Sequence, residues 1–181
     1  MKKASLIRVI FSICITFFIQ FSLFNHVVAS NKMCAIPHEA AAIGGITIGS
    51  SMEYVESIYG TEHAVKTTPF NNQWERVIYN YNNRFTVMGI VHNEDGKTIV
   101  YRVISTDKSL GAEGGFCTGM HIGTVVNKYG KTYIFKDKNG KLIYKYSDKS
   151  TMVTLEFTVN PANKIIEEVA LRYQSDALFI D

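Results

Sequence analysis

The chain has 181 residues, of which 46% are hydrophobic, and it carries 19 Lys and Arg against 16 Asp and Glu. Three of the basic residues and none of the acidic ones lie in residues 1–29, so the rest of the chain is balanced in charge. Nucleic-acid binding needs a clustered excess of Lys and Arg, and this balance therefore excludes a general nucleic-acid partner. About 150 residues suffice for one domain with a core or for two small ones.

The N-terminus predicts export. Lys2 and Lys3 begin the chain, residues 9–24 contain no charged residue, and small or β-branched residues lead to Ala29. These are the parts of a cleaved signal peptide, here residues 1–29. The alternative is an uncleaved membrane anchor, but the apolar run is shorter than the roughly 20 residues that span a bilayer. We expect a periplasmic or extracellular protein with no transmembrane span in the mature chain.

One stretch of sequence occurs twice. GGITIGSSMEYVESIYG (44–60) and GGFCTGMHIGTVVNKYG (114–130) align without a gap at an offset of 70. Within each copy, apolar residues recur at helical spacing and a glycine follows, which predicts short helices over 51–59 and 121–129. The positions that define this motif are Gly49, Val55, Tyr59 and Gly60 in the first copy and Gly119, Val125, Tyr129 and Gly130 in the second.

Strand-like segments follow each helix. They are rich in aromatic and β-branched residues and cover 74–81, 84–92, 97–104, 132–138, 141–146, 152–159 and 165–173. Asp95-Gly96 and Asn139-Gly140 predict two-residue hairpin turns. The predicted fold is α+β, with tandem repeats at 30–108 and 109–181. Each repeat has a short helix, with a possible further short helix at its N-terminal side, packed on three to four antiparallel strands.

The helix motif resembles that of a group of small exported bacterial proteins. The group includes the lipoprotein of the outer-membrane β-barrel assembly machinery (SmpA/OmlA-like) and, in duplicated form, the secreted β-lactamase inhibitor protein. Gly49, Ser51 and Val55 fit the motif, whereas His121 departs from it at the Ser/Thr position. The resemblance implies short helices on one face of a curved antiparallel sheet whose other face is free to bind protein.

Two cysteines lie outside the predicted signal, Cys34 and Cys117. In an oxidising compartment such a pair favours a disulfide, which would join the entrances of the two repeats. The alternative is a pair of buried free thiols.

The sequence contains no recognised catalytic or metal-binding pattern. Histidines at 38, 63, 92 and 121 are scattered singly, and no spacing typical of a metal site occurs. No nucleophile accompanied by a base and an orienting group can be identified. We therefore expect no enzyme activity, no metal and no cofactor.

Alternation in the strands predicts an apolar outer surface on the first repeat. The second repeat has a clear inward face. Transferring its register to the first repeat, with Asn93 matched to Asn160, predicts that Met88 and Ile90 face the core and that other apolar residues of these strands face outward. A register shifted by one residue is the alternative and would reverse the assignment. The outward residues predicted to bind a partner are Trp74, Arg76, Ile78, Phe85 and Val87.

A lysine-rich hairpin adds to this surface. With a two-residue turn at Asn139-Gly140, Lys136, Lys138, Lys141 and Lys145 share one face, opposite a core face that includes Tyr133 and Phe135. Lys141 and Lys145 are predicted to contribute to binding; the alternative is a solvated basic face that protects a sheet edge.

The sequence thus favours an exported, non-enzymatic binding module that uses the open face of a curved sheet. Its partner would be another protein or an envelope component. The alternatives are a structural accessory protein of envelope assembly or the cell surface, and an enzyme of unrecognised type.

Overall fold

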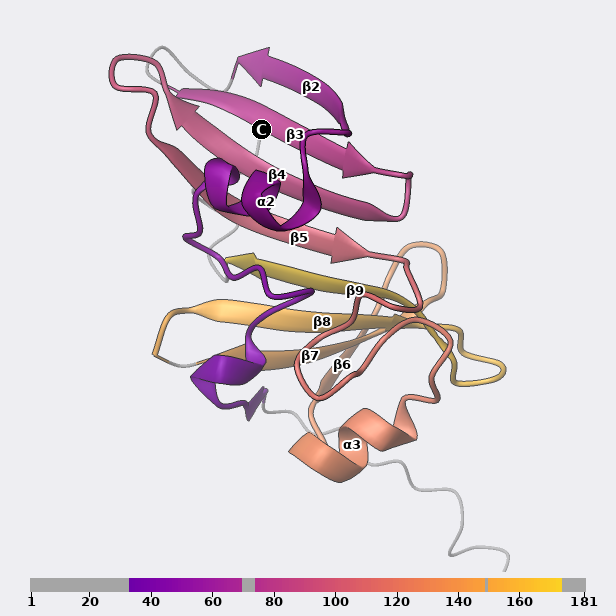
Figure 1. Cartoon of the computed structure of the whole chain (residues 1–181). Coiled ribbons are helices and arrows are strands. Elements are labelled where there is room, and N and C mark those ends of the chain that lie inside the picture. The colour runs from indigo at the N-terminus through magenta and orange to yellow at the C-terminus, as the bar shows by residue number, and fades with distance from the viewer. Residues whose placement is uncertain (1–32, 70–73, 149, 174–181) are drawn as a thin grey trace, which may run out of the picture.

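The structure is a computed structural model that describes residues 33–69, 74–148 and 150–173. The predicted signal peptide lies outside the described residues. Within them, two α-helices lie on one side of a sheet that is antiparallel apart from one short edge pairing (Figure 1). The α+β fold class is confirmed.

The described strands form one nine-stranded sheet in the order β1-β7-β8-β9-β5-β4-β3-β2, with β6 also paired to β7. Strands β5 and β9 pair antiparallel in its middle. A 3-10 turn, η1 (His38–Ala40), follows β1. The strands are β1 (Cys34–Ala35), β2 (Ala64–Pro69), β3 (Trp74–Tyr81), β4 (Phe85–His92), β5 (Thr98–Ser105), β6 (Tyr133–Lys136), β7 (Leu142–Asp148), β8 (Val153–Val159) and β9 (Ile166–Tyr173).

Helix α2 (Met52–Tyr59) begins where the Ser51 side chain accepts a hydrogen bond from the Tyr54 amide. Such a cap satisfies one of the unpaired N–H groups of the first turn. Met52 and Val55 are buried beneath the helix. The side chain of Met52 lies directly over Gly89 of β4, where a Cβ would come within 2.7 Å of the Met52 sulfur. Gly89 thus allows α2 to pack closely on the sheet.

Helix α3 (Gly123–Tyr129) has no side-chain cap at its start, and it buries Val125. Both helices end at a glycine with positive φ, Gly60 at 79° and Gly130 at 89°. With ψ near 180°, this conformation is essentially restricted to glycine. The two glycines therefore fix where the helices stop.

A tyrosine of the sheet holds each of these helix ends. The hydroxyl of Tyr81 in β3 donates to the Gly60 carbonyl at 3.2 Å. The hydroxyl of Tyr146 in β7 donates to the Gly130 carbonyl at 3.1 Å. Both tyrosines are buried, so each bond satisfies a hydroxyl that burial would otherwise leave unpaired.

The predicted disulfide is wrong, because Cys34 and Cys117 are both free. The Cys34 thiol donates to the carbonyl of Tyr129 at the C-terminal end of α3. Cys117 precedes the helix and packs against Gly111. Each thiol thus has its own surroundings in the fold, and no bond joins the two.

Candidate binding face

Among the described residues, α2 and α3 cover one face of the sheet and no helix covers the other, which we call the open face. Figure 1 views the helix-covered side. Cross-strand pairing assigns the open-face residues, because side chains alternate along each strand. On β3, β4 and β5 they are Trp74, Arg76, Ile78, Asn80, Thr86, Met88, Ile90, His92, Ile99, Arg102 and Ile104.

The placement predicted for Phe85 and Val87 is wrong. Both lie on the helix-covered face, where Phe85 is 1% exposed and Val87 is fully buried. The ring of Phe85 packs against that of Tyr59 in α2, with centroids 4.7 Å apart. Met88 and Ile90, expected in the core, are half-buried on the open face instead.

The error came from a one-residue difference between two hairpins. In the first hairpin, the His92 amide donates to the Lys97 carbonyl, and the His92 carbonyl accepts from the Gly96 amide. In the second, Asn160 makes the same two bonds, with Ile165 and Lys164. The residue that corresponds to Asn160 is therefore His92, not Asn93. A shift of one residue exchanges the two faces of a strand, which reversed the whole assignment in β4.

Three of the predicted binding residues, Trp74, Arg76 and Ile78, do share the open face. Trp74 lies edge-on to the ring of His92, its partner across β3 and β4, with centroids 4.6 Å apart. Ile78 lies opposite Met88. These residues form an apolar region with Arg76 beside it.

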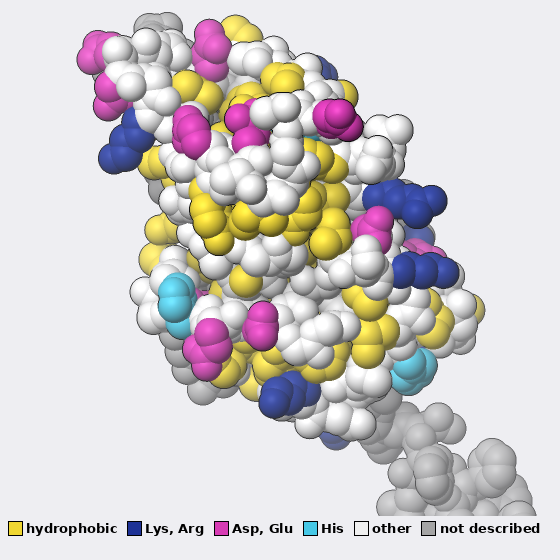
Figure 2. All heavy atoms as spheres, in the orientation of Figure 1, with side chains coloured by type: hydrophobic (Ala, Val, Ile, Leu, Met, Phe, Trp, Pro, Cys, Tyr) yellow, Lys and Arg dark blue, Asp and Glu magenta, His cyan; other side chains and the backbone are white. Residues whose placement is uncertain are grey.

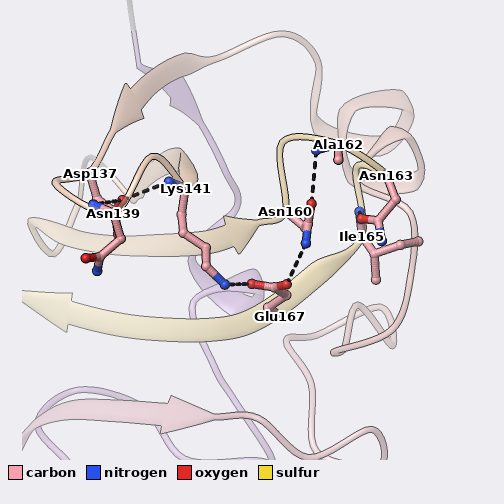
Figure 3. A network of polar contacts seen from close by, with 8 residues as sticks. All are labelled: Asp137, Asn139, Lys141, Asn160, Ala162, Asn163, Ile165 and Glu167. Atoms are coloured by element: carbon pink, nitrogen blue, oxygen red, sulfur yellow. Dashed lines mark hydrogen bonds and ion pairs between the residues drawn. The ribbon is translucent and has the colours of Figure 1, made fainter.

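Of the two predicted lysines, Lys145 lies on the open face within β7, and Lys141 lies just before that strand. Lys141 forms an ion pair with Glu167, whose carboxylate also accepts a hydrogen bond from Asn160 at 3.0 Å. Figure 3 shows this network joining the turn at 137–141 to the turn at 160–165. Lys141 therefore already has a structural partner.

The lysine hairpin also differs from its prediction. The Asp137 amide donates to the Lys141 carbonyl, so the loop at Asn139-Gly140 has three residues rather than two. Lys136 consequently lies opposite Leu142, away from the face of Lys145. Tyr133 and Phe135, expected in the core, are exposed.

A charged cluster occupies the middle of the open face. Glu156 of β8 is only 3% exposed, and its carboxylate lies 2.9 Å from Lys145 and 2.8 Å from Arg172 of β9. Arg102 of β5 lies directly opposite Arg172. Burial, followed by the like charge of Arg172, lowers the pKa of Arg102. Within the described residues no salt bridge reaches Arg102, and its Nε is buried without a hydrogen-bond partner.

A groove of about 490 Å³ lies at the end of the seam between β5 and β9. This volume is typical of small-molecule and peptide sites. Ile90, Ile99 and Tyr101 contribute from one side, and Val153 and Tyr173 from the other. Tyr101 occupies a bulge in β5, and its hydroxyl contacts the Met88 sulfur at 3.8 Å. The lining also includes Ile48, Gly49 and Val100. Because Val100, Val153 and Tyr173 belong to the helix-covered face, the groove lies at the strand ends where the two faces meet.

The described residues contain no group of three or more His, Cys, Asp and Glu side chains placed to hold a metal. The histidines are engaged separately. His38 contacts Asp148 at 2.7 Å, and His63 contacts Glu56 at 2.9 Å. Burial opposes ionisation of Asp148, but hydrogen bonds from Ser150, Thr151 and His38 outweigh it and lower its pKa. None of the helices in the described ranges is long and apolar enough to cross a membrane.

No family model matches the chain, and no curated protein matches it. A cysteine-rich secretory protein of Staphylococcus aureus has 13% identity and a TM-score of 0.49, covering 81% of this chain and 48% of that one. An extracellular SCP-domain protein of Bacillus anthracis has 13% identity and a TM-score of 0.48, covering 84% and 52%. A DUF4309 family protein of Bacillus subtilis has 16% identity and a TM-score of 0.40, covering 77% and 87%. The chain spans about half the length of the first two, and similarity at this level supports no functional argument.

Proposed function

We propose that this protein is an exported, non-enzymatic binding module whose open sheet face contacts another protein or an envelope component. The observation that carries the proposal is the apolar character of the open face on β3, β4 and β5. An antiparallel sheet covered on one side normally presents polar residues on the other. Here Ile78, Met88, Ile90, Ile99 and Ile104 occupy open-face positions beside Trp74.

The charges on this face favour a partner that carries carboxylates. Lys145 and Arg172 both contact Glu156, which leaves Arg102 as a cation without a salt bridge inside the described chain. A partner carboxylate that pairs with Arg102 would also reduce the repulsion between Arg102 and Arg172. Apolar contact with Ile78 and Met88 would accompany that ion pair. Such an arrangement of a buried apolar centre and an arginine is typical of protein interfaces.

We also infer that the chain arose by tandem duplication of a helix-and-sheet unit, as in the exported bacterial group that its helix motif resembles. One observation supports this inference. Tyr81 and Tyr146 make the same hydrogen bond to the glycine that ends each helix. The two four-stranded parts would then meet through β5 and β9.

Export is proposed from the N-terminal sequence. It predicts that protein from the native host begins within a residue or two of Ser30. Intact-mass measurement checks this directly. Recovery of a membrane-bound form that retains residues 1–24 would refute it.

The binding proposal is tested with open-face variants and an envelope extract of the native host. Trp74→Ala and Ile78→Asp should each weaken retention of the protein on the extract by about tenfold, or about 1.4 kcal/mol. Tyr54→Ala is the control, because Tyr54 is 47% exposed on α2, on the opposite side of the sheet. Circular dichroism would establish that each variant is folded. Equal retention of all three variants would contradict the proposal.

A further inference from the structure

A second, separate cavity lies between α3 and the β6–β7 hairpin, on the helix-covered side of the sheet. Its volume is about 220 Å³. The walls are formed mainly by apolar side chains, and Thr132 is buried among them with its hydroxyl donating to the Lys145 carbonyl. The wall residues are Ile122, Val126, Thr132, Ile134 and Tyr144.

The corresponding region under α2 is filled by side chains. There the buried ring of His63 stacks on Tyr79, with centroids 3.9 Å apart, and contacts Glu56 at 2.9 Å. His63 has only 4% of its side chain exposed. The space between this helix and its strands is thus closed by a histidine and its carboxylate partner.

Three backbone relationships match these residues to the walls of the cavity. The Gly60 amide donates to the Glu56 carbonyl at the end of α2, and the Gly130 amide donates to the Val126 carbonyl at the end of α3. Tyr79 lies two residues before Tyr81, which donates a hydrogen bond to Gly60. Tyr144 lies two residues before Tyr146, which donates to Gly130.

His63 corresponds to Thr132. His63 precedes Ala64, which pairs with Asn80, the residue after Tyr79. Thr132 precedes Tyr133, which pairs with Lys145, the residue after Tyr144. Thr132 and Val126 are smaller than His63 and Glu56 and have no charged group, so the cavity under α3 results from these two replacements.

Three basic residues, His121, Lys131 and Lys164, line the same cavity, and no acidic residue does so in the described chain. Lys131 follows the end of α3, whereas the carbonyl of Lys164 accepts from the amide of Ile122 at its start. The His121 Nδ1 accepts from the Gly123 amide at 3.1 Å, which leaves Nε2 as the proton-bearing nitrogen of the neutral ring. All three residues can therefore donate to an anion.

We propose that this cavity binds a small carboxylate with an apolar body, the carboxylate lying among Lys131, Lys164 and His121. An apolar cavity of about 150 Å³ accommodates benzene. The cavity under α3 is larger, so a phenyl ring with a short alkyl group is a suitable size. Burying that apolar body would provide affinity, and the basic residues would select its charge.

The test measures binding of three matched probes to the purified protein by calorimetry and by backbone amide chemical shifts. The probes are para-ethylbenzoate, the neutral para-ethylbenzyl alcohol and the cationic para-ethylbenzylamine. We expect para-ethylbenzoate to bind at least about tenfold more tightly than the amine, a difference of about 1.4 kcal/mol. The amides that shift should be those of Val126, Ile134 and Tyr144.

Two sets of variants separate the cavity from its charges. Val126→Phe or Ile134→Phe fills the space and should abolish binding of all three probes. The matched control is Val65→Phe, since Val65 pairs with Tyr79 as Ile134 pairs with Tyr144, yet is 57% exposed. A folded Ile134→Phe protein suffices if Val126→Phe does not fold.

The double variant Lys131→Gln, Lys164→Gln should remove the preference for the carboxylate while leaving affinity for the alcohol unchanged. Lys128→Gln, an exposed position of α3 outside the cavity, is its control. Equal affinity for carboxylate and amine, shifts elsewhere in the protein, or no binding at millimolar concentration would each overturn the proposal. None of these outcomes depends on the open face.

Discussion

Arg102 of β5 and Arg172 of β9 lie directly opposite each other where the two central strands of the sheet pair. Like charges at such positions repel, and only Arg172 has a salt bridge within the described chain, to Glu156. Burial and this repulsion lower the pKa of Arg102 more than the charges of Glu168 and Glu156 raise it, so the fold carries an electrostatic cost here. In the proposed function, a partner carboxylate offsets that cost.

Replacing Arg102 with methionine tests this cost. Removal of one of two opposed like charges should raise the free energy of unfolding by about 0.2–1 kcal/mol, measured by urea denaturation. Arg172→Met is the matched comparison and should destabilise the protein, because Glu156 is buried and would lose a cationic partner. Destabilisation by Arg102→Met as large as that by Arg172→Met would show that Arg102 has a structural role.

The two valines beneath the helices should be of similar importance to stability. Val55 and Val125 are both fully buried. Truncating either to alanine removes buried methyl groups and leaves a cavity, which should cost about 1–3 kcal/mol. Val65→Ala, on the exposed edge strand β2, should change stability by less than about 0.5 kcal/mol. A small effect at Val125 alone would mean that α3 contributes little to the core.

Alkaline pH should destabilise the protein through Tyr81. Burial, with the charge of Glu56 adding to it, raises the pKa of Tyr81 to about 12 from an ordinary value of 10. The fold thus favours the neutral phenol. This contribution is complete below about pH 10 and is lost as the pH rises toward about 12. In Tyr81→Phe, the decline in unfolding free energy over that range should be shallower than in the parent protein; an identical decline would contradict this assignment.

The two cysteines should react as free thiols. The denatured, unreduced mature protein is expected to react at both Cys34 and Cys117, because neither is bonded to the other in the fold. Intact mass after alkylation counts the modified residues. An unmodified chain lighter by two hydrogens than the reduced chain would show that a bond forms and would contradict the described arrangement.

The sequence predicted the helices and their ends well because those features are local. Apolar spacing located Val55 and Val125, and only glycine readily adopts the backbone found at Gly60 and Gly130. The aromatic and β-branched segments likewise located β3 to β9, whereas β1 and β2 were not predicted. These signals depend on residues close together in the chain, so they can be recognised without knowledge of tertiary packing.

Register and long-range pairing could not be predicted in the same way. One residue of difference at His92 and Asn160 placed Phe85 and Val87 on the wrong face, although Trp74, Arg76 and Ile78 were assigned correctly. The disulfide was inferred from the expected compartment, which contains no information on how the two cysteines lie in the fold.

The central charged residues were also missed. Glu156, Arg102 and Arg172 each occupy the interior of a strand, and a charged residue within such an apolar segment is the signal that could have identified them.

The open face as a binding surface is tested most directly by photo-crosslinking in the native host. A photoreactive amino acid is introduced at Ile78 or Met88 on the open face, or at Tyr54 on α2 as the control. The proposed function predicts one discrete adduct from both open-face positions and none from Tyr54. Adducts from Tyr54 alone, or no adduct from either open-face position, would contradict it.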